Sequence, residues 1–249
     1  VELEREDSYE DILEATKKIE SSFKDFYGRK GYQEIPPVAI SSGIDETVRF
    51  IGSHISVMKP HILDPELLAE GVYMSQDCIR TKNVDKLFDD EYVPKWGSYF
   101  RSIGALAPAE KIEDTFEDLM MYLHEELGLS IENFLFRINS EDSDLMQLFE
   151  GMPSQNLEVN SRSENYYGHK IGIDGVRGRN FNIALLDDMT GSFNDIGNFI
   201  LLENERKTLA VETAIGISTS VQQIEHLDSV MECNPIPYLD GLNLEEGFS

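Results

Sequence analysis

The 249-residue chain has few basic residues for its length. It holds 21 lysines and arginines against 47 aspartates and glutamates, which gives a formal net charge of -26. Proteins that bind DNA or RNA unaided owe most of that affinity to lysine and arginine, which displace counterions from the phosphates. We therefore do not expect unaided binding to tRNA or to any other nucleic acid. Solubility alone is a sufficient reason for an acidic surface of this kind.

Cysteine and long apolar segments are also scarce. The chain has two cysteines, Cys78 and Cys233, and neither belongs to a CxxC pair. This argues against a disulfide scaffold and against a structural zinc site. Residues 1–18 are charged from the start, which excludes a signal peptide there, and no apolar run approaches membrane-spanning length. We expect a cytoplasmic location and no membrane contact.

The common catalytic motifs are missing as well. The sequence has no HExxH, no GxSxG, no GxxxxGK[ST] and no GxGxxG between a strand and a helix. The five histidines are scattered without the spacing of metal ligands: His54, His61, His124, His169 and His226. We therefore predict no metal-ligand set, and no Ser-His-Asp arrangement can be inferred from the sequence.

Hydrophobic periodicity gives the secondary structure. Helical spacing covers residues 8–30, 109–127 and 219–231, and Arg29, Lys30 and Gly31 form a typical helix C-terminus. Six strand-like runs lie at 71–76, 97–100, 133–138, 181–186, 198–203 and 207–214, and polar loops are expected at 138–144 and 154–165. Short connections join the last three strands, and strands joined in this way pair antiparallel. The pattern predicts an α+β fold, with an antiparallel sheet flanked by helices.

One loop stands out between these elements. Residues 171–183 read IGIDGVRGRNFNI, with glycines at every third position from 172 to 178 and arginines at 177 and 179. Backbone amides and basic side chains of this kind can surround an anion. A tight connection that enters the strand at 181 explains the glycines equally well. Both interpretations stay open at this point.

Seven short segments follow one another in a recognisable order. They are FKDFYGRKGYQEIPPVAI (23–40), RFIGSHISVMKPHIL (49–63), SQDCIRTKN (75–83), SYFRSIGAL (98–106), GIDGVRGRNFNI (172–183), DIGNFILLE (195–203) and VETAIGISTSV (211–221). In this order they resemble the aminoacylation domain of alanyl-tRNA synthetase, a class II synthetase, from its motif 1 to its motif 3. The resemblance implies a single class II synthetase-like catalytic domain over residues 1–249. It leaves no room for tRNA-recognition, editing or C-terminal domains.

The resemblance also implies how an amino acid would be held. It places five residues around the amino acid: Glu212, Ile200, Gly175, His169 and Asn198. Glu212 stands where the family has an aspartate that binds the ammonium group, so the charge is kept on a longer side chain. Ile200 replaces a valine of the pocket wall. The tryptophan that closes the family's pocket is absent, so Tyr166, Tyr167 or His169 must stand near that place. These changes imply a small amino acid that need not be alanine.

The nucleotide site implied by the resemblance is less complete. It includes Arg80, Lys82, Arg177, Arg179 and Gly216, with Arg80 and Arg101 as catalytic candidates. Arg80 matches the motif 2 arginine that contacts the α-phosphate, a task that suits a planar guanidinium; a surface arginine in a salt bridge is the alternative. Thr219 replaces the motif 3 arginine that grips the γ-phosphate. Either Arg101, Arg177 or Arg179 supplies that cation instead, or the ATP site has decayed.

Three functions are compatible with this pattern. The first is an enzyme that activates a small amino acid with ATP and Mg²⁺ and passes it to a carrier protein or small molecule. The second is a non-catalytic protein that keeps the fold to bind a ligand or regulate a partner. The third is an acyl transferase that accepts a preformed aminoacyl donor. Class II cores commonly pair through motif 1, so a homodimer is also an expectation.

Overall fold

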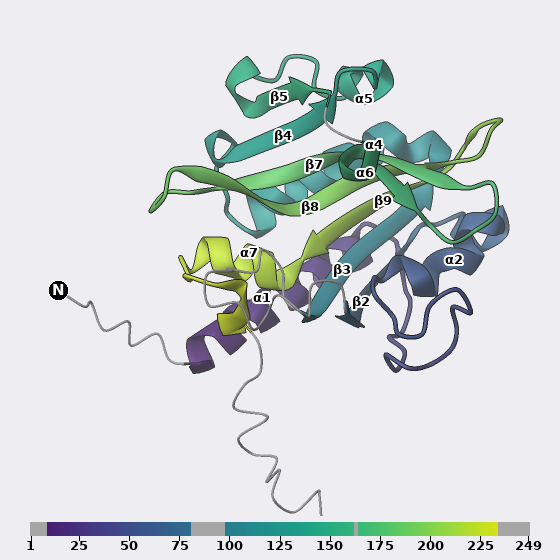
Figure 1. The fold of residues 1–249 in the computed structure, drawn as a ribbon, viewed down its shortest axis with the longest axis horizontal. Helices are drawn as coiled ribbons and strands as arrows, with labels where there is room; N and C mark the ends of the chain where they lie inside the picture. The colour runs from purple at the N-terminus through teal and green to yellow at the C-terminus, as the bar shows by residue number, and fades with distance from the viewer. Residues whose placement is uncertain (1–8, 81–97, 162–163, 234–249) are drawn as a thin grey trace, which may run out of the picture.

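A nine-stranded sheet forms the centre of the molecule in the computed structural model, which describes residues 9–80, 98–161 and 164–233 (Figure 1). The strand order is β1-β2-β3-β9-β8-β7-β4-β5, and β6 pairs with β7 beside this path. The strands are β1 (Gln33–Glu34), β2 (Val72–Ile79), β3 (Tyr99–Pro108), β4 (Phe134–Asn139), β5 (Leu157–Asn160), β6 (Gly168–Lys170), β7 (Arg177–Asp187), β8 (Ser192–Glu203) and β9 (Thr208–Gly216). Only β1–β2 and β4–β5 pair in parallel among these strands. The predicted α+β fold with a largely antiparallel sheet is confirmed.

Seven α-helices flank the sheet in the described residues: α1 (Tyr9–Arg29), α2 (Ile55–Leu63), α3 (Pro65–Leu68), α4 (Ile112–Met121), α5 (Ser143–Gln147), α6 (Glu164–Tyr167) and α7 (Ile217–Ile224). The predicted first helix is confirmed, and Gly31 after it has a φ of +87°. The second predicted helix consists of α4 and one π-helical turn, Tyr122–Glu126. The predicted helix at 219–231 was placed too late, because α7 starts directly at the end of β9 and ends at Ile224.

The two faces of the sheet are covered differently. Side chains alternate between faces along a strand, so residues 101, 103, 105 and 107 of β3 point to one side and residues 100, 102, 104 and 106 to the other. We call the first side the helix face, because it packs on α1, α4 and α7 through residues such as Phe23, Phe116 and Val221. We call the other side the cleft face; α2 and α3 cover part of it through Met58 and Leu68.

The connections between strands differ in part from the prediction. The three strands expected within 181–214 form the antiparallel set β7-β8-β9, as predicted, but β7 already begins at Arg177 because its first residues pair with β6. The segment 154–165 was expected to be a polar loop; instead it contains β5, which pairs in parallel with β4, and the start of α6. Of the loop expected at 138–144, residues 140–142 connect β4 to α5, and the other residues belong to these two elements.

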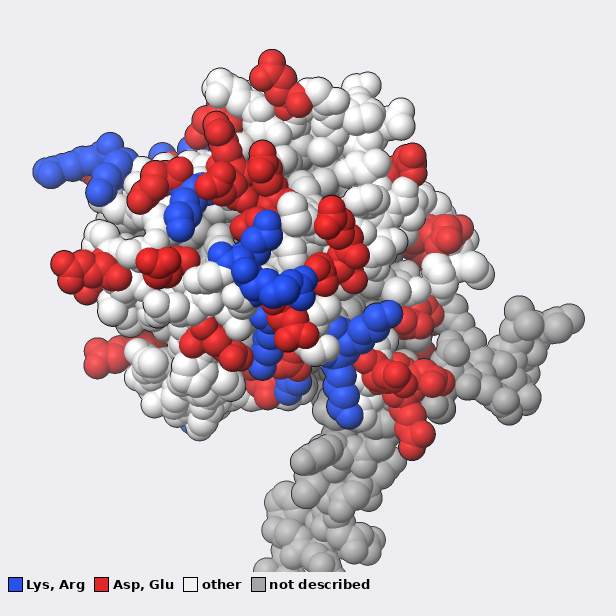
Figure 2. All heavy atoms as spheres, turned by 180° about the vertical axis from the view of Figure 1, so that it is seen from behind, with Lys and Arg blue, Asp and Glu red and all other residues white. Residues whose placement is uncertain are grey.

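Acidic side chains spread widely over the face of the molecule in Figure 2, and the basic ones gather mostly near its middle. This distribution agrees with the formal charge of -26. Both cysteines are free, as the sequence predicts. No helix among the described residues is long and apolar enough to cross a membrane.

Candidate functional site

A cleft of about 1050 Å³ opens on the cleft face of the sheet, between the strand centre, α7 and the segment around β6. Several of the predicted site residues line it: Arg80, His169, Asn198, Ile200, Glu212 and Gly216. They come from segments far apart in the chain. The pairing of β7, β8 and β9 brings four of them together, because Ile200 lies directly opposite Glu212 and Asn198 lies opposite Ala214.

Glu212 is the charged residue at the floor of this cleft. Its side chain projects from the middle of β9 and the residue is only 1% exposed. Oε1 lies 2.9 Å from Nε2 of His54, although the approach is out of line for a well-formed hydrogen bond. Oε2 is buried and has no partner among the described residues. A buried carboxylate oxygen without a partner is costly, so this atom is suited to a ligand that brings a positive charge or a donor.

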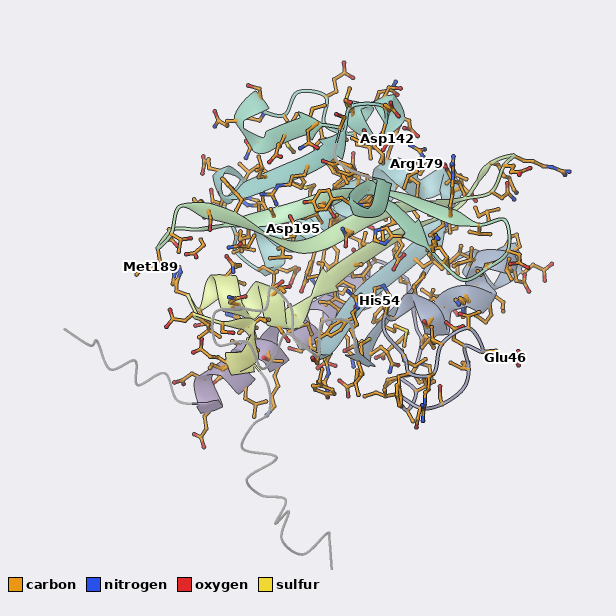
Figure 3. All side chains as sticks on the ribbon, in the orientation of Figure 1. Glu46, His54, Asp142, Arg179, Met189 and Asp195 are labelled. Atoms are coloured by element: carbon orange, nitrogen blue, oxygen red, sulfur yellow. The ribbon has the colours of Figure 1, made fainter. Side chains whose placement is uncertain are left out.

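His54 completes a buried chain of three polar side chains. It precedes α2, is fully buried, and has its Nδ1 2.7 Å from Oγ of Ser102. Figure 3 shows His54 in front of the central strands. The ring fits there because position 104 is glycine: a Cβ on Gly104 would lie 1.9 Å from Nε2 of His54. The sequence therefore places a small residue where the imidazole must cross β3.

Arg80 lies at the rim of the cleft, directly after β2. Its Nε donates to the carbonyl oxygen of Gly52 at 2.9 Å, and its guanidinium carbon lies 4.9 Å from the centre of the Phe100 ring. Its side chain is exposed and faces the cleft. A planar cation held over an aromatic ring presents several donors in a fixed orientation, which suits the recognition of carboxylate or phosphate oxygens.

The wall opposite Arg80 contains His169, Ile200 and Asn198. Burial lowers the pKa of His169 below its usual value of 6.5, and the positive charge of Arg80 acts in the same direction, while Glu212 acts against both. We therefore treat His169 as a neutral polar group at pH 7. Asn198 donates from Nδ2 to Oδ1 of Asn182 on the neighbouring strand. These three residues thus form an uncharged part of the wall, in which His169 and Asn198 are polar and Ile200 is apolar.

Three predicted arginines, Arg101, Arg177 and Arg179, do not line the cleft. Arg101 is on the helix face, where it pairs with Glu20 at 2.7 Å and with Asp77 at 2.8 Å. Arg179 pairs with Asp142, Asp144 and Glu203, and Figure 3 shows it beside Asp142 and away from His54. Lys82, the remaining predicted cation, lies outside the described residues.

The glycine loop itself is a connection into β7. Arg177 and Arg179 lie on either side of Gly178 in β7, so their side chains share one face of the strand. Arg177 pairs with Glu203. Gly172 and Gly175 have φ values of +74° and +75°, a conformation that favours glycine. Gly175 lines a separate surface hollow and not the cleft. The loop therefore agrees with a tight connection between β6 and β7, and its arginines point away from Glu212.

The end of the cleft beneath α7 carries no cation from that helix. The sequence of α7, ISTSVQQI, has no lysine or arginine, and Oγ1 of Thr219 donates to the carbonyl oxygen of Gly216 at 2.9 Å. Arg137, which also lines the cleft, is bound by Glu158 and Asp195. In the described part of the chain, the other lysine and arginine residues along the cleft are Arg80 and Lys170.

The resemblance of the sequence implies a magnesium ion beside ATP, and no group of three metal-ligating side chains lies next to Arg80 in the described residues. They contain a single group of three metal-ligating side chains, Asp187, Asp188 and His226, whose ligand atoms lie within 4.8 Å of one another. Mg²⁺ prefers oxygen ligands in octahedral geometry, whereas this group includes an imidazole. The group lies where the β7–β8 hairpin meets the region after α7, and two of its members, Asp187 and His226, line the cleft. We therefore derive no chemical step through a metal.

Sequence reasoning missed three residues of this site. His54, Ser102 and Phe100 lie within segments that carry the resemblance, but no motif marks them as functional. Their placement depends on which face of β3 meets the cleft and on the packing of α2 over β3. The one available signal was alternation along the strand, which puts residues 100, 102 and 104 on a single face.

Neither a protein-family model nor a curated protein sequence matches the chain. Its structure is similar to asparaginyl-tRNA synthetase from Pyrococcus horikoshii (8% identity, TM-score 0.55, 91% of this chain and 66% of that chain). It is also similar to aspartyl-tRNA synthetase from Entamoeba histolytica, with 10% identity and a TM-score of 0.54 over 90% of this chain and 58% of that chain. A third similar structure is histidyl-tRNA synthetase from S. aureus, with 14% identity and a TM-score of 0.51 over 87% of this chain and 65% of that chain. The chain thus spans 58 to 66% of the length of these synthetases. They serve three different amino acids, so the likeness concerns the shared fold and not the alanyl family in particular. The chain has the fold of a class II aminoacyl-tRNA synthetase catalytic domain.

Proposed function

We propose that this chain binds a small amino acid and activates its carboxylate with ATP, for transfer to an acceptor other than tRNA. The observation that carries the proposal is the unpartnered, buried Oε2 of Glu212 at the floor of a cleft that has Arg80 at its rim. An α-amino acid carries an ammonium group and a carboxylate a short distance apart. Glu212 would hold the first, and Arg80 would stabilise the charge that develops on the phosphate attached to the second.

The size of the substrate follows from the wall of the cleft. Ile200 lies directly opposite Glu212 in the strand pairing, and His169 stands beside them as a neutral group. A long or charged substrate side chain would meet these residues next to the ammonium site. The proposal therefore favours an amino acid with a small, uncharged side chain. A carrier protein or a small molecule is the proposed acceptor, because the acidic surface opposes unaided binding of tRNA.

The main alternative is a protein that binds an amino acid without activating it. This alternative is favoured by the end of the cleft beneath α7, where that helix has no basic residue to bind a γ-phosphate and Arg101, Arg177 and Arg179 pair with acidic residues elsewhere. Without a cation at that end, the pyrophosphate leaving group loses an interaction worth several kcal/mol. Such a chain would recognise a free amino acid and transmit its presence to a partner.

Exchange of labelled pyrophosphate into ATP, tested with each of the twenty amino acids, separates the two functions. The enzyme predicts exchange with one or a few small amino acids, reduced at least about 100-fold in Arg80→Ala. Arg49→Ala is a matched control, because Arg49 also lies over an aromatic ring, Phe50, but outside the cleft. Amino-acid binding by calorimetry without any exchange supports the alternative. If neither binding nor exchange is found, both functions are wrong.

A further inference from the structure

Ser102, His54 and Glu212 form a continuous polar chain that the proposed activation reaction does not use in full. Oγ of Ser102 lies 2.7 Å from Nδ1 of His54, and Nε2 of the same ring lies 2.9 Å from Oε1 of Glu212. We propose that Ser102 is a nucleophile that carries an aminoacyl group as an ester, with His54 as its general base and Glu212 as the residue that orients His54. The inference shares Glu212 with the proposed function but does not rest on ATP.

The order of the three side chains fits this role. Nδ1 of His54 lies within hydrogen-bond distance of Oγ of Ser102, while Nε2 faces Oε1 of Glu212 without a well-formed hydrogen bond to it. In the proposed role, Nδ1 accepts the proton of the Ser102 hydroxyl. A serine that donates to a histidine held by a carboxylate is the arrangement that activates a hydroxyl for attack on a carbonyl. In the common Ser-His-Asp triad, Nε2 faces the serine and Nδ1 faces the carboxylate. Here the two nitrogens are exchanged, but the proton still passes from the serine to the histidine.

The burial of the three residues separates the base from water while the serine faces the cleft. Ser102 and Glu212 both line the cleft, whereas His54 is fully buried between the start of α2 and β3. Gly104 keeps the ring in this place, because any side chain there would overlap with Nε2. The base is thus held rigidly and reaches the cleft only through the hydroxyl of Ser102.

A cation is available for the charge that develops on the carbonyl oxygen. Phe100 and Ser102 are two residues apart on β3 and point to the same face, a spacing of about 7 Å. The guanidinium of Arg80 lies over the ring of Phe100, the next residue on that face, and both Arg80 and Ser102 line the cleft. Arg80 can therefore stabilise an oxyanion formed at Ser102.

The acyl donor that this site would take is an aminoacyl thioester. Oγ of Ser102 attacks the thioester carbonyl carbon while its proton passes to Nδ1 of His54. The C–S bond breaks, and the thiolate leaves with the proton from His54. The acyl group stays on Ser102 as an ester, its ammonium group at Oε2 of Glu212. An amine or hydroxyl acceptor then attacks the ester carbon by the reverse proton path and restores the serine. No phosphate is involved, so a cation beneath α7 is not needed.

Mass spectrometry of the acylated protein tests this inference directly. The full chain is incubated without ATP, once with the N-acetylcysteamine thioester of alanine and once with an alkyl fluorophosphonate, and the modified peptide is mapped. We expect one adduct, on Ser102, with both probes. The adduct should vanish in Ser102→Ala and its rate should fall at least tenfold in Glu212→Gln. The fluorophosphonate has no ammonium group, so that second effect reports on His54 and not on substrate binding.

Two controls keep the result decisive. Ser218→Ala removes another serine that lines the cleft, and this variant should be labelled like the original protein. Ser102→Cys preserves the size of the side chain and should become acylated at residue 102 by the thioester. If the folded protein gives no adduct with either probe, or if the adduct lies on another residue, Ser102 has only a structural role and the inference is wrong. Because ATP is absent, this outcome is independent of the pyrophosphate exchange.

Discussion

Glu212 combines a structural cost with the proposed function of holding an ammonium group. It is buried beneath the cleft, one oxygen faces His54, and the other has no partner in the described part of the chain. An unsatisfied buried carboxylate oxygen lowers stability, by about 1 to 3 kcal/mol for a group of this kind. A ligand ammonium group would offset that cost on binding. This is why we assign ligand recognition to Glu212 and not to the exposed acidic residues.

A second buried carboxylate, Asp45, gives a prediction for stability and pH. Asp45 is buried, which raises its pKa, but hydrogen bonds from Lys59, Thr47 and Ser56 outweigh that effect and lower the pKa to about 2. Since the folded pKa lies below the unfolded value of 3.8, the stabilisation is complete above pH 3.8 and is lost as the pH falls toward 2. Asp45→Asn should therefore lower the free energy of unfolding at pH 7 by about 2 kcal/mol.

Urea unfolding at a series of pH values checks this prediction. The difference between the original protein and Asp45→Asn should be constant between pH 7 and 5 and should shrink below pH 4. Glu46→Gln is the matched control, because Glu46 is the exposed neighbour in the same loop and should change stability by less than about 0.5 kcal/mol. Equal effects of the two substitutions would show that the ion pair with Lys59 does not stabilise this loop.

At the scale of the elements, the site depends on the contact between α2 and β3. His54 precedes α2, and its ring crosses β3 at Gly104. The strands β3, β9 and β8 bring Ser102, Glu212 and Ile200 to the same face through their pairing. The proposed nucleophile and the carboxylate therefore lie on strands, while the proposed base, His54, comes from the residue that precedes α2.

Gly104→Ala should disturb this contact and little else. The added Cβ would overlap with the His54 ring at 1.9 Å, so the ring must move and the two polar contacts to Ser102 and Glu212 must break. We expect a loss of stability of about 1 to 3 kcal/mol. Gly52→Ala is the control, since a Cβ there meets its nearest neighbour at an ordinary 3.5 Å. Thermal unfolding followed by circular dichroism measures both, and equal melting temperatures would contradict the packing described for His54.

Local sequence patterns predicted the elements better than they predicted the site. The apolar spacing of α1 and the short connections of β7, β8 and β9 are local, so helix and strand positions followed from them. The strand at 154–165 escaped prediction because it is short and is formed by pairing with β4. Motif order led to Arg80 and Glu212, which line the cleft, but also to Arg101 and Arg179, which do not. Which face of a strand meets the ligand depends on tertiary packing, and nothing in the local sequence specifies it.

At the scale of the whole molecule, the charge of -26 has consequences of its own. Acidic residues repel one another across the surface, and this repulsion destabilises the compact state at low ionic strength. Salt at 1 M reduces the screening length to about 3 Å, compared with about 10 Å at 0.1 M. The same charge opposes any polyanionic partner.

Potassium chloride should therefore stabilise the protein. We expect the melting temperature at pH 7 to rise by at least about 3 °C between 0.05 and 1 M, which corresponds to about 1 kcal/mol for a chain of this size. The same titration near pH 4.4, the isoelectric point, should show little change because the net charge is close to zero. A melting temperature that falls with salt at pH 7 would mean that attractive ion pairs outweigh the repulsion.

The most direct test of the account is calorimetric titration of the protein with amino acids, with and without Glu212. We predict that at least one small, uncharged amino acid binds, and that Glu212→Gln weakens its binding by at least about tenfold, as expected for the loss of a charge-assisted hydrogen bond. The matching α-hydroxy acid, which lacks the ammonium group, should bind weakly to both proteins. If no amino acid binds, or if binding is the same in Glu212→Gln, then the buried carboxylate is not an ammonium site and the central claim is wrong.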